Sequence, residues 1–351
     1  MNHFIKKLMP LVLISSLGAV FFTHSMEGDM ALESPFGVKF GVNFEPISKI
    51  KLPVKNGVLR AVVSPDSKEV LIGEVNNVRL YDIKTGTLLQ EFPEHPWLIN
   101  SLAFSPYGNA ILTAGGKIAR YCNKTTGSVL HEFTEDSPIT AVAFSPDGTT
   151  IFIATSDGTA RLWDIRKKAF VQDLKLKLAP HQQSLRFVEN AVAFSPDGSF
   201  LLTSFYDPNS PTNSGHMLLW DLETTTVLHD LVTSGPVDAI TFSSDSTLIL
   251  AGRSYPKPSL WSVSTGEELK EFWGNSGNIF SVAFSPDNKV AITGADYGTV
   301  TLWDVETGKE LKELKEHTGP VKQIAISPFS PYGQTMHTVY SDGTVITWGN
   351  A

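Results

Sequence analysis

Histidine, cysteine and carboxylate side chains are the groups in this chain with the greatest capacity for chemistry, but their spacing predicts none. The nine histidines have no metal-type local spacing, and Cys122, the single cysteine, has no partner for a disulfide. The chain also lacks a Gly-x-Ser-x-Gly elbow, a phosphate-binding glycine loop and a Cys-x-x-Cys pair. We therefore expect no catalytic residue, no metal site and no cofactor.

Short strands and tight turns would have to position any site in this chain. Residues 139–165 contain two turns: Ser145-Pro146-Asp147-Gly148, which favours a type I turn, and Asp157-Gly158, which favours a two-residue hairpin. Around these turns lie runs of β-branched, aromatic and small residues, Ala141–Phe144, Thr150–Ala154 and Ala160–Trp163. Both faces of these runs are largely apolar, which predicts small sheets covered on both sides.

This stretch recurs seven times along the chain. The turns begin at Ser64, Ser105, Ser145, Ser195, Ser243, Ser285 and Ser330, and the aromatic residues downstream are Tyr81, Tyr121, Trp163, Trp220, Trp261, Trp303 and Trp348. Six of the seven turn-to-aromatic spacings fall between 16 and 18 residues, and the fourth repeat carries an insertion. A repeat period near forty with this pattern is typical of a β-propeller with four strands per blade.

Residues 44–349 resemble the WD-repeat β-propeller family. The resemblance implies an all-β fold, a seven-bladed propeller of four-stranded antiparallel blades. It implies that Trp163, Trp220, Trp261, Trp303 and Trp348 are structural and pack between blades. In the family a His, a Ser or Thr, a hairpin Asp and the Trp form a hydrogen-bonded tetrad, which His317, Asp342 and Trp348 match. The third repeat matches only in part, with Asp157 and Trp163, and Cys122 falls at the Asp position that follows the repeat aromatic.

The two ends of the chain predict how the ring closes. Residues 44–52 alternate charged and apolar side chains, as the outer strands of later repeats do, and the chain ends three residues after Trp348. The seventh repeat therefore has no outer strand of its own. We expect the N-terminal strand to complete the last blade, because an open ring would leave unpaired edges.

The first 25 residues predict an export signal. Lys6 and Lys7 precede an uncharged, mostly apolar run at residues 8–22, which is short for a membrane span. We expect cleavage after Ser25, a linker at residues 26–43, a propeller at 44–351 and a periplasmic or secreted protein. The alternative is an uncleaved membrane anchor at residues 8–22. The formal net charge of −8 argues against nucleic acid or an anionic membrane as the partner.

Irregular loops rich in aromatic residues predict a surface that binds another protein. Trp and Tyr are favoured at binding hot spots, and in the family the loops that carry them open on one face. The candidate contact residues are Trp97, Phe187, Tyr206, Asn209, Arg253, Tyr255, Lys257 and Trp273. We expect an exported, non-catalytic scaffold, a monomeric propeller within a complex. The alternative is a propeller-type hydrolase or lactonase with a dispersed site at the channel mouth.

Overall fold

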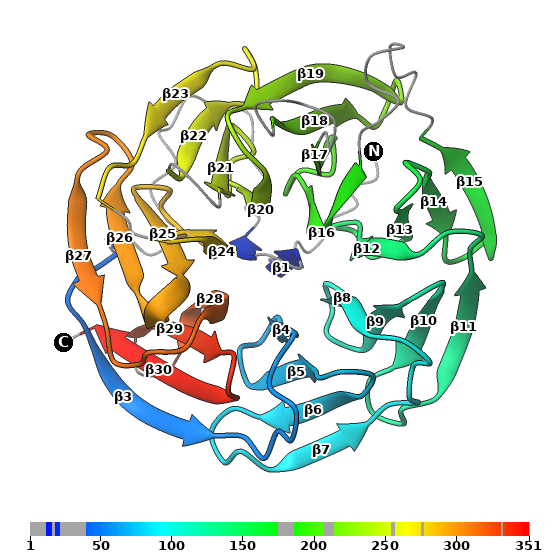
Figure 1. Cartoon of the computed structure of the whole chain (residues 1–351), viewed down its shortest axis with the longest axis horizontal. Helices are drawn as coiled ribbons and strands as arrows, with labels where there is room; N and C mark the ends of the chain where they lie inside the picture. The colour runs from blue at the N-terminus through cyan, green and yellow to red at the C-terminus, as the bar shows by residue number, and fades with distance from the viewer. Residues whose placement is uncertain are drawn as a thin grey trace, which may run out of the picture.

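The chain folds into a ring of seven four-stranded antiparallel sheets. The computed structural model describes residues 12–15, 18–21, 40–174, 186–206, 214–253, 257–274, 277–330 and 333–350. Within these ranges there are 30 strands and a single short 3-10 helix at Asp296–Gly298. The predicted all-β, seven-bladed propeller is confirmed (Figure 1).

The first three blades follow one another in sequence. Blade 1 consists of β4 (Arg60–Val63), β5 (Glu69–Gly73), β6 (Val78–Asp82) and β7 (Leu88–Glu91). Blade 2 consists of β8 (Ile99–Phe104), β9 (Ala110–Gly115), β10 (Ile118–Asn123) and β11 (Val129–Thr134). Blade 3 consists of β12 (Ile139–Phe144), β13 (Thr150–Thr155), β14 (Ala160–Asp164) and β15 (Ala169–Asp173).

The next three blades repeat the same order from the inner strand outward, and the last takes its outer strand from the N-terminus. Blade 4 consists of β16 (Arg186–Phe194), β17 (Phe200–Tyr206), β18 (Gly215–Asp221) and β19 (Thr226–Thr233). Blade 5 consists of β20 (Val237–Phe242), β21 (Leu248–Arg253), β22 (Ser259–Ser262) and β23 (Glu268–Glu271). Blade 6 consists of β24 (Ile279–Phe284), β25 (Val290–Ala295), β26 (Val300–Asp304) and β27 (Glu310–Leu314). Blade 7 consists of β28 (Val321–Ser330), β29 (Gly333–Tyr340), β30 (Thr344–Asn350) and β3 (Phe44–Lys51).

The N-terminal strand closes the ring as predicted. β3 pairs antiparallel with β30, from Phe44 opposite Asn350 to Lys51 opposite Thr344, and the two lie side by side in Figure 1. Packing begins earlier than expected, because Phe40 is buried against Phe44 with ring centroids 5.3 Å apart. The segment expected to be a linker therefore joins the propeller from residue 40 onward.

The core lies between neighbouring blades. Every residue of β9, β12 and β25 is buried, because a blade covers each face of these strands. Trp163 of blade 3 packs on blade 2, with its ring centroid 5.1 Å from that of Phe133. Trp303 of blade 6 packs in the same way on Phe272, at 5.6 Å.

Blade 2 departs from the expected alignment by one residue. In blade 3 a register shift precedes Trp163, which pairs with Ile151; in blade 2 the equivalent shift precedes Cys122, which pairs with Ile111. Cys122, not Tyr121, therefore occupies the position of the repeat tryptophan, and its assignment to the Asp position is wrong. Burial raises the pKa of its thiol to about 11, so the side chain acts as a small apolar core residue.

A small hairpin from the N-terminal segment lies in the middle of the ring. β1 (Val12–Ser15) and β2 (Gly18–Phe21) pair antiparallel, and β2 lies against the inner strands β24 and β28 (Figure 1). The rest of residues 1–39 lies outside the described residues. Among those that are described, no helix has the length and apolar character needed to cross a membrane.

Candidate functional site

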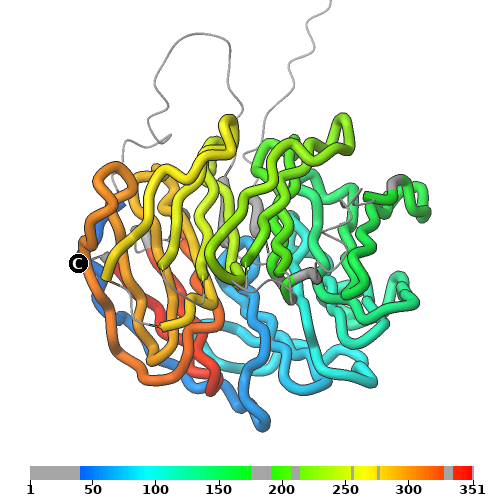
Figure 2. The backbone as a smooth tube through the Cα atoms, turned by 45° about the horizontal axis from the view of Figure 1, so that its top comes forward, coloured from blue at the N-terminus to red at the C-terminus, as the bar shows by residue number. Residues whose placement is uncertain are grey.

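The antiparallel blades divide the connecting segments between two faces of the ring (Figure 2). The connections between blades, and the hairpins that join the second and third strands, open on what we call the loop face. The turns that join the first to the second strand, and the third to the fourth, open on the opposite side, the turn face. The candidate contact residues that the structure describes all fall on segments of the loop face or on the strand ends beside it: Trp97, Phe187, Tyr206, Arg253, Lys257 and Trp273.

Trp97 projects from the loop face between blades 1 and 2. It is 65% exposed, and its indole covers Gly116 so closely that a side chain added there would collide with it. The Ile99 amide donates to the Val75 carbonyl at 2.9 Å, which joins this loop to the β5–β6 hairpin. Val75 and Leu98 are exposed as well, so a small apolar patch surrounds the tryptophan. Sequence reasoning missed both residues, although Leu98 directly follows Trp97.

Beside this patch a buried histidine holds the loop in place. His95 Nε2 lies 2.8 Å from the Thr113 hydroxyl. Burial, together with the nearby charge of Arg120, lowers the pKa of His95 to about 4, so the ring is neutral at pH 7. His95 precedes β8 by the same interval as His317 precedes β28. Sequence reasoning missed this member of the tetrad pattern because blade 2 lacks both the hairpin Asp and the Trp.

Trp273 belongs to the loop that joins β23 of blade 5 to β24 of blade 6. This connection lies across the ring from the connection between β7 and β8, which carries Trp97 (Figure 1). It is 68% exposed, and the Lys257 ammonium lies over its indole ring in a cation–π contact. The same ammonium lies 3.9 Å from a carboxylate oxygen of Glu271. The structure thus brings two of the predicted contact residues, Lys257 and Trp273, into direct contact.

Arg253 stabilises this corner from inside and does not reach the surface. It is only 2% exposed, and its guanidinium pairs with Glu268 at 2.9 Å and Glu271 at 3.2 Å. Its Nε donates to the Lys257 carbonyl at 2.7 Å. Arg253 was expected to contact a partner, but its charge is already paired with Glu268 and Glu271. Its role is instead to position the backbone of Lys257.

The remaining candidates are placed only in part. Tyr206 is half-buried at the end of β17, and the backbone of Phe187 pairs with Phe205 in the same blade. Asn209 and Tyr255 lie outside the described residues. A further aromatic, Tyr297, which was not among the candidates, is exposed on the loop face of blade 6.

The tetrad of blade 7 is split into two pairs. Trp348 Nε1 donates to Thr338 Oγ1 at 2.9 Å, and His317 Nε2 lies 3.3 Å from Asp342. His317 Nδ1 accepts the Gly319 amide at 2.9 Å instead of bonding to Thr338. The ring of Tyr340 packs on the imidazole with centroids 4.4 Å apart. Asp342 also pairs with Lys51 of β3, which ties the tetrad to the strand that closes the ring.

Asp157 organises the hairpin of blade 3, and its charge should make stability depend on pH. Burial acts to raise its pKa, but hydrogen bonds from Thr155, Ser137 and the Thr159 amide lower it to about 2. The pKa of Asp157 in the folded protein lies below its unfolded value of about 3.9. The ionised carboxylate therefore stabilises the fold above pH ~4, and this stabilisation is lost as the pH falls toward 2. Asp157→Asn should lower the melting temperature by a few degrees at pH 7.

Thermal unfolding from pH 7 to pH 2 checks this prediction. The difference in melting temperature between the wild type and Asp157→Asn should shrink below pH ~4. The matched control is Asp136→Asn, which changes an exposed carboxylate that makes no hydrogen bond among the described residues. A difference for Asp157→Asn that stays constant down to pH 2 would contradict the role given to the ionised carboxylate.

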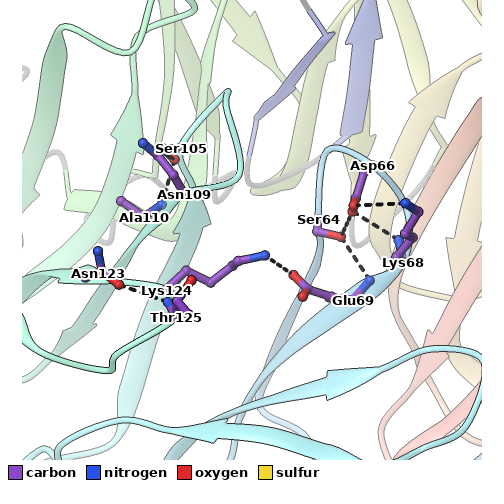
Figure 3. Close-up of polar contacts among 10 residues, drawn as sticks. All are labelled: Ser64, Asp66, Lys68, Glu69, Ser105, Asn109, Ala110, Asn123, Lys124 and Thr125. Atoms are coloured by element: carbon purple, nitrogen blue, oxygen red, sulfur yellow. Dashed lines mark hydrogen bonds and ion pairs between the residues drawn. The ribbon is translucent and has the colours of Figure 1, made fainter.

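The turn face consists of turns that bond to one another. The Ser64 hydroxyl donates to Asp66 at 2.7 Å and accepts the Glu69 amide at 2.9 Å, and Lys124 of blade 2 reaches Glu69 of blade 1 at 2.5 Å (Figure 3). Further bonds between the turns of adjacent blades run from Tyr107 to Asp147, from Asp197 to Ser246 and from Ser244 to Asn288. These polar groups are occupied in holding the blades together, so the turn face has a structural explanation.

Among the described residues no group of three or more His, Cys, Asp or Glu side chains could hold a metal ion.

Comparison with known proteins identifies the family. The sequence profile described as WD domain, G-beta repeat matches residues 86–121, 127–164, 173–221, 266–304 and 308–349, more than half of the chain. The chain belongs to the WD-repeat family. The resemblance inferred from the seven turns and their aromatic residues is therefore confirmed.

Several relatives in the WD-repeat family are named as members of protein complexes. The target of rapamycin complex subunit wat1 of Schizosaccharomyces pombe is 24% identical over 58% of this chain and 62% of its own length. The COMPASS component SWD3 of Saccharomyces cerevisiae is 22% identical over 60% of this chain and 66% of its own. The small ribosomal subunit protein RACK1y of Oryza sativa is 26% identical over 37% of this chain and 39% of its own. Each match spans less than two thirds of the relative.

Proposed function

We propose that this protein is an exported, non-catalytic scaffold that binds a partner protein with its loop face. The observation that carries the proposal is the contrast between two groups of tryptophans. Trp163, Trp220, Trp261, Trp303 and Trp348 are at most 5% exposed, whereas Trp97 and Trp273 are 65% and 68% exposed. A large aromatic side chain that stays in water does not gain the favourable free energy that burial of its surface would give. Trp is also among the residues most favoured at the centres of binding sites.

The surroundings of these two tryptophans support the proposal. Gly116 beneath Trp97, and Lys257 over Trp273, restrict how each indole can move. A side chain that is already ordered loses less entropy when a partner binds. Their distribution across the ring suits a partner that spans the loop face. The names of the relatives as complex subunits agree with a role of this kind.

Export is supported by the sequence of the first 25 residues, in which two lysines precede the apolar run 8–22. On this proposal the mature chain begins near Met26 and meets its partner outside the cytoplasm. Mass spectrometry of the N-terminus of purified protein tests this directly. A chain that still begins at Met1 would contradict cleavage.

The binding proposal is tested by affinity capture from the compartment in which the protein resides. The wild-type protein is compared with a variant carrying Trp97→Ala and Trp273→Ala, and captured proteins are identified by mass spectrometry. The control is Lys289→Ala, which removes an exposed side chain from the turn face. We expect one partner to be retained by the wild type and the control, and its recovery to fall at least tenfold with the double variant.

Equal recovery with the double variant and the wild type would contradict a contact role for these tryptophans. All three proteins must show the same melting temperature, within about 2 °C, for recovery to report on binding. A partner lost with the control but kept by the double variant would assign binding to the turn face, against the proposal.

A further inference from the structure

The β1–β2 hairpin contacts the ring on several sides. β2 lies against β24 of blade 6 and β28 of blade 7, whereas β1 lies beside β8 of blade 2 and β16 of blade 4. These four inner strands belong to blades on different sides of the ring (Figure 1). A two-stranded hairpin that reaches all four of them lies within the circle of inner strands and not on the outside of the propeller.

The backbone pairing of the hairpin is internal. Val12 pairs with Phe21 and Ser15 with Gly18, and the two strands form a sheet separate from all seven blades. The inner strands also receive bonds from neighbouring blades, since the Ile324 amide of blade 7 donates to Ser281 Oγ of blade 6 at 2.9 Å. The hairpin is therefore not a fifth strand of any blade, and its composition has to explain why it stays at the centre.

Residues 12–21 have a composition that suits removal from water. The whole run 8–22 contains no charged residue and is mostly apolar. Burial of apolar surface is favourable by about 25 cal/mol per Å², and the antiparallel pairing satisfies the backbone groups that face each other across the hairpin. A charged segment at the same place would lose its hydration without compensation.

The chain between the hairpin and blade 7 has the length to place the hairpin there. Phe40 is buried, and its amide donates at 3.3 Å to Asp287 in the turn between β24 and β25. Residues 22–39 separate the hairpin from Phe40, and a chain of this length spans at most roughly 60 Å. Because the hairpin and the ring belong to one chain, its effective concentration is on the order of millimolar, so that even a weak site is occupied.

We propose that the centre of the ring is a binding site for an uncharged, strand-forming peptide segment, and that residues 12–21 of the chain itself occupy it until the N-terminus is cleaved. The cleavage rests on the proposed function, whereas occupancy of the uncleaved chain does not. While the hairpin is in place, the apolar run is withheld from a membrane and from the export machinery that recognises such a run. Folding and export therefore compete for the same residues, and export has to begin before the ring closes.

Thiol labelling of the full 351-residue chain, made by cell-free synthesis so that its N-terminus is retained, tests the inference. The reporter is Lys322→Cys on β28, the inner strand beside β2. The control reporter is Lys289→Cys, at an exposed position on the turn face. Cys122 is completely buried, so its reaction reports unfolding. Mass spectrometry of peptides gives the rate of reaction with a maleimide at each cysteine.

The variant that removes the hairpin from the ring is Ala19→Asp combined with Val20→Asp in β2. Adjacent residues of a strand point to opposite faces, so one carboxylate meets the inner strands whichever face the hairpin turns toward them. We expect this variant to raise the labelling rate at residue 322 at least tenfold. The matched control exchanges the same two residues, Ala19→Val with Val20→Ala, and should change that rate less than twofold. The rate at residue 289 should be the same in all three chains.

Equal rates at residue 322 with and without the two aspartates would overturn the inference. If Cys122 reacts as well, the aspartate variant has unfolded, and a second measurement decides. A photoreactive group on Val20→Cys in the otherwise unchanged chain should crosslink to peptides from β24 or β28 of the same molecule. Absence of such crosslinks would overturn the inference. Either failure would leave the scaffold function standing, because Trp97 and Trp273 test that function on a different surface.

Discussion

Replacing Phe44 with alanine should destabilise the entire ring by about 3–5 kcal/mol, as for other buried phenylalanines. Phe44 is 1% exposed and packs in one cluster with Phe40, Trp348 and residues of blade 6. It lies on β3, whose pairing with β30 joins the two ends of the chain. Loss of this packing therefore weakens the contact that closes the ring as well as one blade, and urea denaturation measures the cost.

Ile47→Ala is the matched control on the same strand. Ile47 is 53% exposed, so its truncation should change the free energy of unfolding by only about 0.5 kcal/mol. If Phe44→Ala costs no more than Ile47→Ala, β3 does not contribute the closure that the structure shows. Deletion of residues 44–52 should have a larger effect still, because it exposes the edge of β30.

The second large effect is expected for Trp303→Ala. Trp303 is completely buried, and its Nε1 donates to Thr293 Oγ1 at 3.0 Å. Truncation leaves a cavity against Phe272 and an unpaired hydroxyl, so we expect a loss of roughly 3–5 kcal/mol. Chemical denaturation followed by far-ultraviolet circular dichroism measures it.

Trp273→Ala removes the same side chain from a position thirty residues earlier and is the matched comparison. Because Trp273 lies in water, its loss should change stability by no more than about 0.5 kcal/mol while weakening capture of the partner. Similar losses of stability for the two variants would show that Trp273 serves the fold, and the argument for the loop face would fail.

The fold could be predicted from sequence because its signals are local. Turn residues, runs of apolar and β-branched residues and the spacing from turn to aromatic all act within about twenty positions. The missing outer strand of the seventh repeat then required the N-terminal strand to supply it. The one error of alignment, at Cys122, arose because a register shift of a single residue is invisible when an aromatic stands next to the true position.

The candidate site could be predicted only in outline. Position in the repeat separated the exposed Trp273 from the buried Trp303. Residue type did not show that Arg253 is buried, because its burial depends on the acids that surround it.

Hydrogen–deuterium exchange on the protein with and without its captured partner tests the central claim most directly. If the loop face binds the partner, peptides covering residues 93–99, 271–279 and 296–298 should exchange more slowly in the complex. Peptides covering the turns at residues 105–108, 145–148 and 285–288 should exchange at unchanged rates. Protection confined to the turn segments, with the loop segments unaffected, would contradict the account.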